Sequence, residues 1–231
     1  VEIWLPQDSP VLLREMSVND GATCMVQEDT RPRWVTYGSS LTHCVRAHSP
    51  ARIWPAILSR RYDLNLISLG YGGQCCLDAM LGFVIRTFDA DFVTLKMGIN
   101  CIGAGHLSAR TYPASAVGLV RVIRETQPET PIVLVSPIGH PPTETTPNPV
   151  GYTISGMRTD LKDVSERLIA AGDSNLTYAD GLDVFSLPEI DEWAEDECHP
   201  NADGIELMAE NFDRAVMVPF LPEALGARRK G

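Results

Sequence analysis

The stretch RWVTYGSSLT, residues 33–42, decides the fold. Its first half, Arg33–Tyr37, is a short run rich in residues that favour β-strands. Gly38, Ser39 and Ser40 follow at once, and small residues that leave a buried strand can expose a hydroxyl group at the edge of a sheet. The same pattern is also typical of a strand-ending turn with a serine cap. The stretch therefore raises the question whether Ser40 is a nucleophile or a turn residue.

Apolar runs of this kind recur along the chain, and segments with helical spacing separate them. The runs rich in Val, Ile and Leu are residues 33–37, 64–69, 91–96, 131–136 and 176–179. The helical segments are about 55–62, 77–88, 112–127, 154–171 and 203–218. Apolar strands that alternate with amphipathic helices are what a parallel sheet covered on both faces requires. We therefore predict an α/β fold, a three-layer α/β/α sandwich with about five parallel strands.

The chain divides at about residue 31. Residues 1–31 carry Pro6, Pro10 and Gly21, with Pro32 directly after them, and contain one strand-like run, Val1–Leu5. They are expected to form an N-terminal segment or linker. Residues 32–231 hold all five strand-helix repeats, and this length is usual for one α/β domain.

Composition limits the classes of partner. The formal net charge is -11 and the pI is near 4.8, which argues against a nucleic acid or an anionic membrane surface as the partner. The chain has no apolar run of membrane-spanning length and no signal-like start, so a cytoplasmic location is expected. The six cysteines are irregularly spaced, and we expect neither a metal nor another cofactor. The sequence predicts no oligomeric state.

The residues that follow the strands carry the candidate chemistry, because ligands of an open parallel sheet bind beyond the carboxyl ends of its strands. Ester cleavage by a nucleophile needs a hydroxyl group, a base, an orienting carboxylate and donors for the oxyanion. Ser40 follows the first strand and Asn100 follows the third. Asp196 and His199 lie three residues apart in a late loop. This spacing lets the carboxylate accept from the imidazole Nδ1, which leaves Nε2 to face Ser40.

Four short blocks of the sequence resemble those of the SGNH hydrolases, also called the GDSL lipase/esterase family, from about residue 34 to 212. Residues 38–41, Gly-Ser-Ser-Leu, correspond to the Gly-Asp-Ser-Leu block, and Gly73 to the glycine of the second block. Residues 98–101, Gly-Ile-Asn-Cys, correspond to Gly-x-Asn-Asp, and residues 196–199 to Asp-x-x-His. The resemblance implies a flavodoxin-like strand order.

By this resemblance, Ser40 is the nucleophile, His199 the base and Asp196 its orienting carboxylate. The oxyanion hole would consist of the backbone N–H groups of Ser40 and Gly73 and the side-chain amide of Asn100. Glycine suits the second position because the backbone there must come close to the substrate. A side-chain amide suits the third because it is a neutral donor.

The chain departs from the family blocks at two positions, where Ser39 and Cys101 replace aspartates. These changes put the orientation of the first block in doubt. The sequence around Ser40 also resembles a bacterial branch in which a β-sandwich precedes the hydrolase domain. Residues 1–31 would then be a linker or the remnant of that sandwich, and residues 32–231 the catalytic domain.

The function implied is a serine carboxylic-ester hydrolase that cleaves small-molecule esters with short acyl chains, such as those of sugars or natural products. An acyltransferase with the same residues is the alternative within the family. A non-catalytic carbohydrate-binding homologue is the alternative from another class. His43 and Arg110 are candidates for lining the substrate site, and loops 102–111 and 137–153 are expected to shape it.

Overall fold

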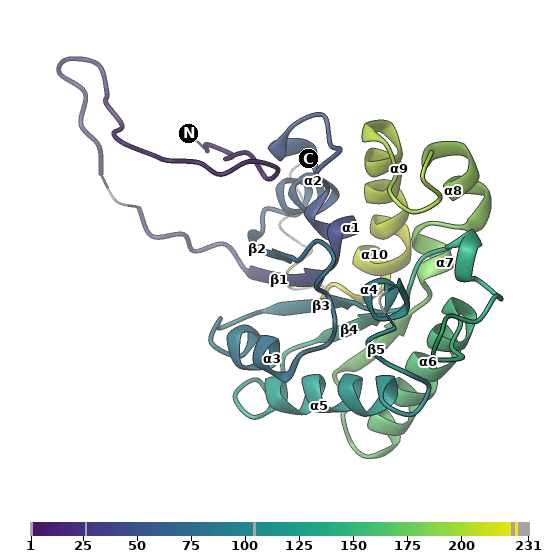
Figure 1. The fold of residues 1–231 in the computed structure, drawn as a ribbon. Coiled ribbons are helices and arrows are strands. Elements are labelled where there is room, and N and C mark those ends of the chain that lie inside the picture. Colours follow the sequence, from purple (N-terminus) through teal and green to yellow (C-terminus); the bar gives the residue numbers. More distant parts are fainter. Residues whose placement is uncertain (1, 26, 104, 223–224, 226–231) are drawn as a thin grey trace.

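Five parallel strands form the centre of the protein in the computed structural model, which describes residues 2–25, 27–103, 105–222 and 225 (Figure 1). The strands are β1 Arg33–Gly38, β2 Asn65–Gly70, β3 Phe92–Lys96, β4 Ile132–Val135 and β5 Leu176–Ala179. Their order across the sheet is β2-β1-β3-β4-β5, and every neighbouring pair is parallel. The predicted three-layer α/β fold and its flavodoxin-like order are confirmed, and each strand lies within one residue of its predicted bounds.

Four longer helices occupy the predicted segments: α2 Trp54–Arg61, α5 Tyr112–Arg124, α6 Ile154–Ala170 and α9 Ala202–Phe212. Helix α3 is shorter than expected, Ala79–Ile85, because Leu77 has a φ of 60° and cannot start a helix. The segment after α9 continues as a π-helical turn, Asp213–Met217, and as α10 Val218–Phe220. No helix in the described part of the chain is long and apolar enough to cross a membrane.

Several short elements were not predicted, since one turn leaves no readable periodicity in a sequence. They are α1 Ser40–His43, α4 Ile99–Gly103, α7 Gly181–Val184 and α8 Leu187–Trp193, with the 3₁₀ turns Pro50–Arg52 and Pro141–Thr143. Helices α1 and α4 directly follow β1 and β3, so the candidate serine and asparagine both lie in short helices at the edge of the sheet.

The sheet separates two apolar cores because successive strand residues point to opposite faces. Trp34 packs on one face with residues of α2 and α9, and its neighbour Val35 packs on the other with residues of α5 and α6. The first core is strongly aromatic, with Trp54 stacked on Phe212 at a ring-centroid distance of 4.3 Å. This core joins α2, which follows the first sequence block, to α9, which follows the last (Figure 1).

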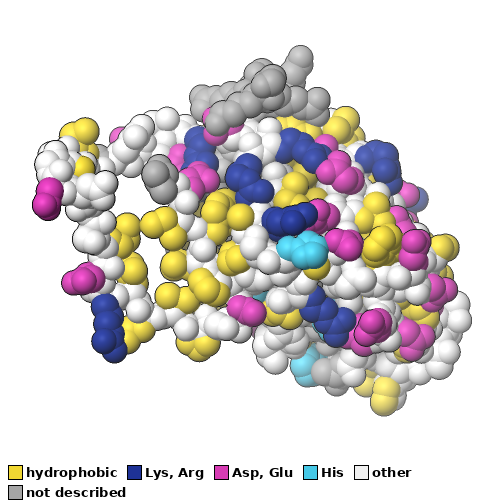
Figure 2. Space-filling model, turned by 90° about the horizontal axis from the view of Figure 1, so that it is seen from above, with side chains coloured by type: hydrophobic (Ala, Val, Ile, Leu, Met, Phe, Trp, Pro, Cys, Tyr) yellow, Lys and Arg dark blue, Asp and Glu magenta, His cyan; other side chains and the backbone are white. Residues whose placement is uncertain are grey.

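The N-terminal segment differs from its prediction. Residues 2–5 form no strand, and residue 1 lies outside the described part of the chain. The apolar side chains of this run find no neighbouring strand; Trp4 instead lies under the guanidinium of Arg60, 5.5 Å from it. Farther along, apolar side chains such as Leu12 and Leu13 are exposed, and Figure 2 shows such side chains along this segment.

Helix α1 lies directly against the end of β2, and glycine permits this contact. A Cβ atom at Gly70 would lie 2.5 Å from the backbone nitrogen of His43 and 2.7 Å from its Cα. At Gly38 a Cβ atom would lie 2.2 Å from Oγ1 of Thr42. The position of α1 therefore depends on two residues without side chains at the ends of adjacent strands.

We predict that Gly70→Ala displaces α1, because the added methyl group meets backbone atoms that cannot rotate away. The expected result is a loss of roughly 1–3 kcal/mol of stability together with reduced activity. Gly118→Ala is the matched control, since Gly118 lies in α5 and a Cβ there meets nothing within 4 Å. It should gain about 0.5–1 kcal/mol. Thermal unfolding of both variants tests this, and equal stability of the two would contradict it.

Candidate active site

Ser40 is the first residue of α1, directly beyond β1. Ser39 is the N-cap of this helix, and its hydroxyl accepts a hydrogen bond from the Leu41 N–H at 3.2 Å. Serine and aspartate are about equally good at this position. The serine at the aspartate position of the first block therefore still caps the helix that holds Ser40.

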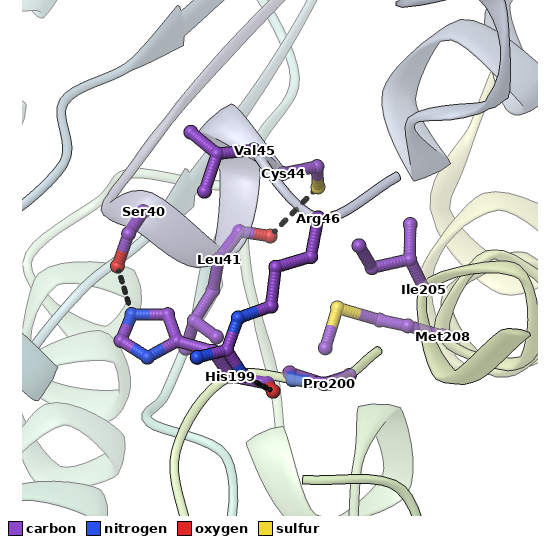
Figure 3. Close-up of a pocket in the computed structure, with 9 residues that line it drawn as sticks. All are labelled: Ser40, Leu41, Cys44, Val45, Arg46, His199, Pro200, Ile205 and Met208. Carbon is purple, nitrogen blue, oxygen red and sulfur yellow. Dashed lines mark hydrogen bonds between the residues drawn. The ribbon is translucent and has the colours of Figure 1, made fainter. Parts of the chain in front are cut away.

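The structure brings Ser40, His199 and Asp196 into one hydrogen-bonded chain. Figure 3 shows the part of it between Ser40 and His199. The Oγ of Ser40 lies 2.8 Å from Nε2 of His199. On the other side of the ring, Nδ1 lies 2.9 Å from Oδ2 of Asp196. With Nδ1 donating to the carboxylate, Nε2 is the acceptor that faces the serine hydroxyl. This is the geometry in which an imidazole can remove the serine proton.

Asp196 is held in an orientation that favours its ionised form. Its Oδ1 accepts from the backbone N–H of His199 at 2.7 Å and from that of Cys198 at 3.2 Å. Burial raises the pKa of Asp196, but the hydrogen bonds from His199 and Cys198 outweigh it and set the pKa below the ordinary value. The carboxylate is therefore charged throughout the neutral range.

Candidate oxyanion donors surround Ser40. The turn after β2 lies beside the serine, since a Cβ built on Gly72 would be 3.8 Å from Cβ of Ser40. Gly73 in this turn has a φ of 72°, a conformation that favours glycine. Within the described residues, neither the Ser40 nor the Gly73 backbone N–H donates a hydrogen bond. Both are free to donate to a substrate oxygen.

Asn100 is oriented by a contact with the backbone of Cys75. Its Oδ1 accepts from the Cys75 N–H at 2.9 Å, which makes the amide nitrogen the group left to donate. The adjacent Cys101 thiol lies 3.6 Å from the Cys75 carbonyl oxygen. The cysteine at the aspartate position of the third block thus contacts the same residue as Asn100 and links α4 to the turn after β2.

Two cations near the site were not predicted from the sequence. Arg46, in the loop after α1, donates to Asp196 Oδ2 at 2.8 Å and to the His199 carbonyl at 2.7 Å. Lys96 ends β3 and is only 4% exposed, and burial lowers its pKa to about 8. Neither residue belongs to a motif or a periodic pattern, so no sequence signal pointed to them.

The two candidate substrate-lining residues lie in different places. His43 follows Ser40 in α1, and its Nε2 is hydrogen-bonded to the carbonyl of Gln7 in the N-terminal segment. Arg110 lines a hollow between α3 and α5 with Leu77, apart from the pocket beside Ser40. Contact of either residue with substrate stays a prediction.

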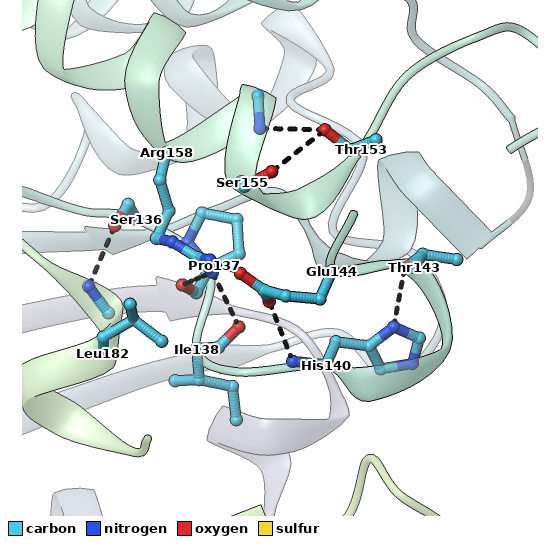
Figure 4. Close-up of polar contacts among 12 residues, drawn as sticks. Ser136, Pro137, Ile138, His140, Thr143, Glu144, Thr153, Ser155, Arg158 and Leu182 are labelled. Carbon is cyan, nitrogen blue, oxygen red and sulfur yellow. Dashed lines mark hydrogen bonds and ion pairs between the residues drawn. The ribbon is translucent and has the colours of Figure 1, made fainter. Parts of the chain in front are cut away.

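The loop after β4 is anchored by a buried arginine of α6 (Figure 4). Arg158 forms an ion pair with Glu144 and donates to the carbonyl oxygens of Pro137 and Ile138 at 3.3 and 3.4 Å. The loop carries His140, whose pKa is lowered below the ordinary value, chiefly by burial. The charges of Glu197 and Asp196 oppose this shift, and His199 adds to it.

No group of three or more His, Cys, Asp or Glu residues in the described chain could hold a metal ion. The site consists of a serine, an imidazole, a carboxylate and free N–H donors on a flavodoxin-like sheet. This combination defines a class of serine-dependent hydrolases and acyltransferases. Comparison with known proteins narrows the class.

Residues 31–217 match the GDSL-like lipase/acylhydrolase family, and the chain belongs to it. The resemblance seen in the four blocks is thereby confirmed. A search of curated protein sequences finds no match.

Solved structures with the same fold include both esterases and a transferase. The salicylyl-acyltransferase SsfX3 from a tetracycline biosynthetic pathway is 34% identical over 86% of this chain and 57% of its own, with a TM-score of 0.78. A putative GDSL-like lipase from Bacteroides ovatus is 23% identical over 81% of this chain and 53% of its own, with a TM-score of 0.68. An acetylxylan esterase from Geobacillus stearothermophilus is 19% identical over 81% of this chain and 95% of its own, with a TM-score of 0.61. The chain thus spans a little over half the length of the first two.

We predict that Asn100→Asp lowers kcat by about 100- to 1000-fold, the usual effect of removing one oxyanion donor. Aspartate keeps the acceptor for the Cys75 N–H and the shape of the side chain, but it has no amide to donate. KM should change little. Steady-state kinetics on an activated ester measure both constants, and a variant with more than half of the original kcat would exclude Asn100 as an oxyanion donor.

Proposed function

We propose that this protein is a serine carboxylic-ester hydrolase that acts on short-chain acyl esters of small molecules through an acyl-enzyme on Ser40. The observation that carries the proposal is the 2.8 Å contact between Ser40 Oγ and His199 Nε2, with Asp196 on the opposite ring nitrogen. Membership of the GDSL-like lipase/acylhydrolase family supports the same class of reaction.

The proposed reaction has two halves. Ser40 Oγ attacks the ester carbonyl carbon while its proton moves to His199 Nε2, and the oxyanion accepts from the N–H groups of Ser40 and Gly73 and from Nδ2 of Asn100. The tetrahedral intermediate collapses, and His199 returns the proton to the leaving alcohol. Water then attacks the acyl-enzyme with His199 as base, which releases the carboxylic acid and restores Ser40.

Acyl transfer to an alcohol or amine is the second candidate, because the 34% identical relative is a salicylyl-acyltransferase. Its first half-reaction would be the same, and an acceptor would replace water in the second. The distribution of acyl product between free acid and acceptor ester, measured with a panel of sugars and phenols, separates the two candidates. Constant hydrolysis at every acceptor concentration would exclude transfer for those acceptors.

We predict that Ser40→Ala loses at least about 1000-fold in hydrolysis of p-nitrophenyl acetate, because Ser40 Oγ is the hydroxyl group hydrogen-bonded to His199 Nε2 among the residues that the structure describes. The neighbouring serine provides the control. Ser39→Ala removes the N-cap of α1 and should lower stability by about 1 kcal/mol, yet keep most of the activity. If Ser40→Ala kept more than about a tenth of the rate, the assignment of the nucleophile would be wrong.

We predict that kcat/KM falls as the pH drops below about 6 to 7, since the base must be a neutral imidazole. The lowered pKa of Asp196 keeps the carboxylate ionised across this range. Because the pKa of Asp196 is lower in the folded than in the unfolded protein, its carboxylate stabilises the folded state at any pH above about 3.9, the pKa of an unfolded aspartate. This stabilisation is lost only as the pH falls below that value toward the lower folded-state pKa. Activity should therefore decline before this contribution to stability does. Parallel pH profiles of kcat/KM and melting temperature test the order, and a flat rate down to about pH 4 would exclude His199 as base.

A further inference from the structure

We infer that Arg46 is a positioning residue that joins the nucleophile segment to the Asp196–His199 loop. Its guanidinium donates from Nη2 to Asp196 Oδ2 at 2.8 Å and from Nη1 to the His199 carbonyl at 2.7 Å. Figure 3 shows the side chain reaching from the loop after α1 toward His199. The inference rests on the proposed function, in which these two residues orient and perform the proton transfer.

The contact links parts of the site that the chain keeps far apart. Ser40 and His199 are 159 residues apart in sequence, and their side chains meet where the start of α1 lies against the Asp196–His199 loop. Arg46 follows the candidate nucleophile by six positions in the sequence. It donates hydrogen bonds to two acceptors in the Asp196–His199 loop, the backbone carbonyl of His199 and the side chain of Asp196. A planar guanidinium can make two such bonds at once, which a lysine ammonium cannot reproduce with the same geometry. Displacements of about 1 Å can cost about 100-fold in rate, so this connection matters for catalysis.

Arg46 also acts on the charge balance of the pair. Asp196 Oδ2 accepts from Arg46 and from His199 Nδ1 at the same time. The cation withdraws part of the carboxylate charge that would stabilise a protonated imidazole. Arg46→Met therefore removes a positive charge beside the carboxylate–imidazole pair. Among the described residues, other charged or titratable groups that interact with this loop, and that the substitution leaves in place, include Lys96 on β3, His140 after β4, and Glu197 and Cys198 in the loop itself.

An ion pair this exposed can also be a mere surface contact, since its side chains are 44% and 40% exposed. The chain offers a matched control for that alternative. Arg52 forms an ion pair with Glu206 of α9, so it joins neighbouring segments, and that contact includes neither Asp196 nor His199. Arg52→Met removes a comparable pair without touching the candidate active site.

The experiment compares Arg46→Met, Arg46→Lys and Arg52→Met in kcat, KM, pH profile and melting temperature. For Arg46→Met we expect kcat to fall about 10- to 100-fold with KM within about twofold. The acid limb of the profile should move to higher pH, because the substitution removes a positive charge beside the pair. Arg46→Lys should keep the position of the acid limb and recover part of kcat. Arg52→Met should match the original protein.

Two further measurements keep the inference testable. An NMR titration of the histidine ring signals follows the same shift without substrate, and melting temperatures identify a variant that does not fold. If Arg46→Met behaves like Arg52→Met in rate and pH profile, Arg46 is only a surface ion pair and the inference is wrong. The same holds if Arg46→Lys moves the acid limb as far as Arg46→Met does. If instead Ser40→Ala keeps its activity, the proposed function itself fails, so the two failures are distinct.

Discussion

The close contact of α1 with the ends of β1 and β2 is the constraint on which the site depends. Gly38 and Gly70 end adjacent strands, and any side chain there would overlap Thr42 or the backbone of His43. Because these positions are bare, the serine at the start of α1 lies beside the turn that carries Gly73. Close packing of α1 against the ends of these strands therefore fixes the positions of the candidate nucleophile and of one candidate oxyanion donor.

A second junction connects the loops after β2 and β3. Both backbone polar groups of Cys75 are hydrogen-bonded to residues of α4, the N–H to Asn100 and the carbonyl to the thiol of Cys101. An aspartate in place of Cys101 could not donate to a carbonyl when ionised. The change from the family block is thus consistent with a locally adjusted hydrogen bond, and it leaves the amide nitrogen of Asn100 free.

The parts predicted from sequence are those with local or repeating signals. The five strands could be predicted because strands buried on both faces need continuous apolar runs. Ser40, Asn100 and His199 could be proposed because each belongs to a short sequence block. Helix α1 was missed because it is one turn long. The expected strand at residues 2–5 was wrong because apolar composition cannot supply a neighbouring strand. Arg46 was missed because its partner is 150 residues away.

The difference between hydrolysis and transfer lies outside the serine, imidazole and carboxylate, which serve both reactions equally. What decides between them is which nucleophile reaches the acyl-enzyme while His199 is neutral. The side chains of His199 and Asp196 are 34% and 40% exposed, so solvent reaches the base from at least one side. In the proposed hydrolysis, water would reach the acyl-enzyme from this side, whereas transfer would require an acceptor that covers it. The loop after β4, which Arg158 anchors, carries His140 and stays a predicted part of the substrate site.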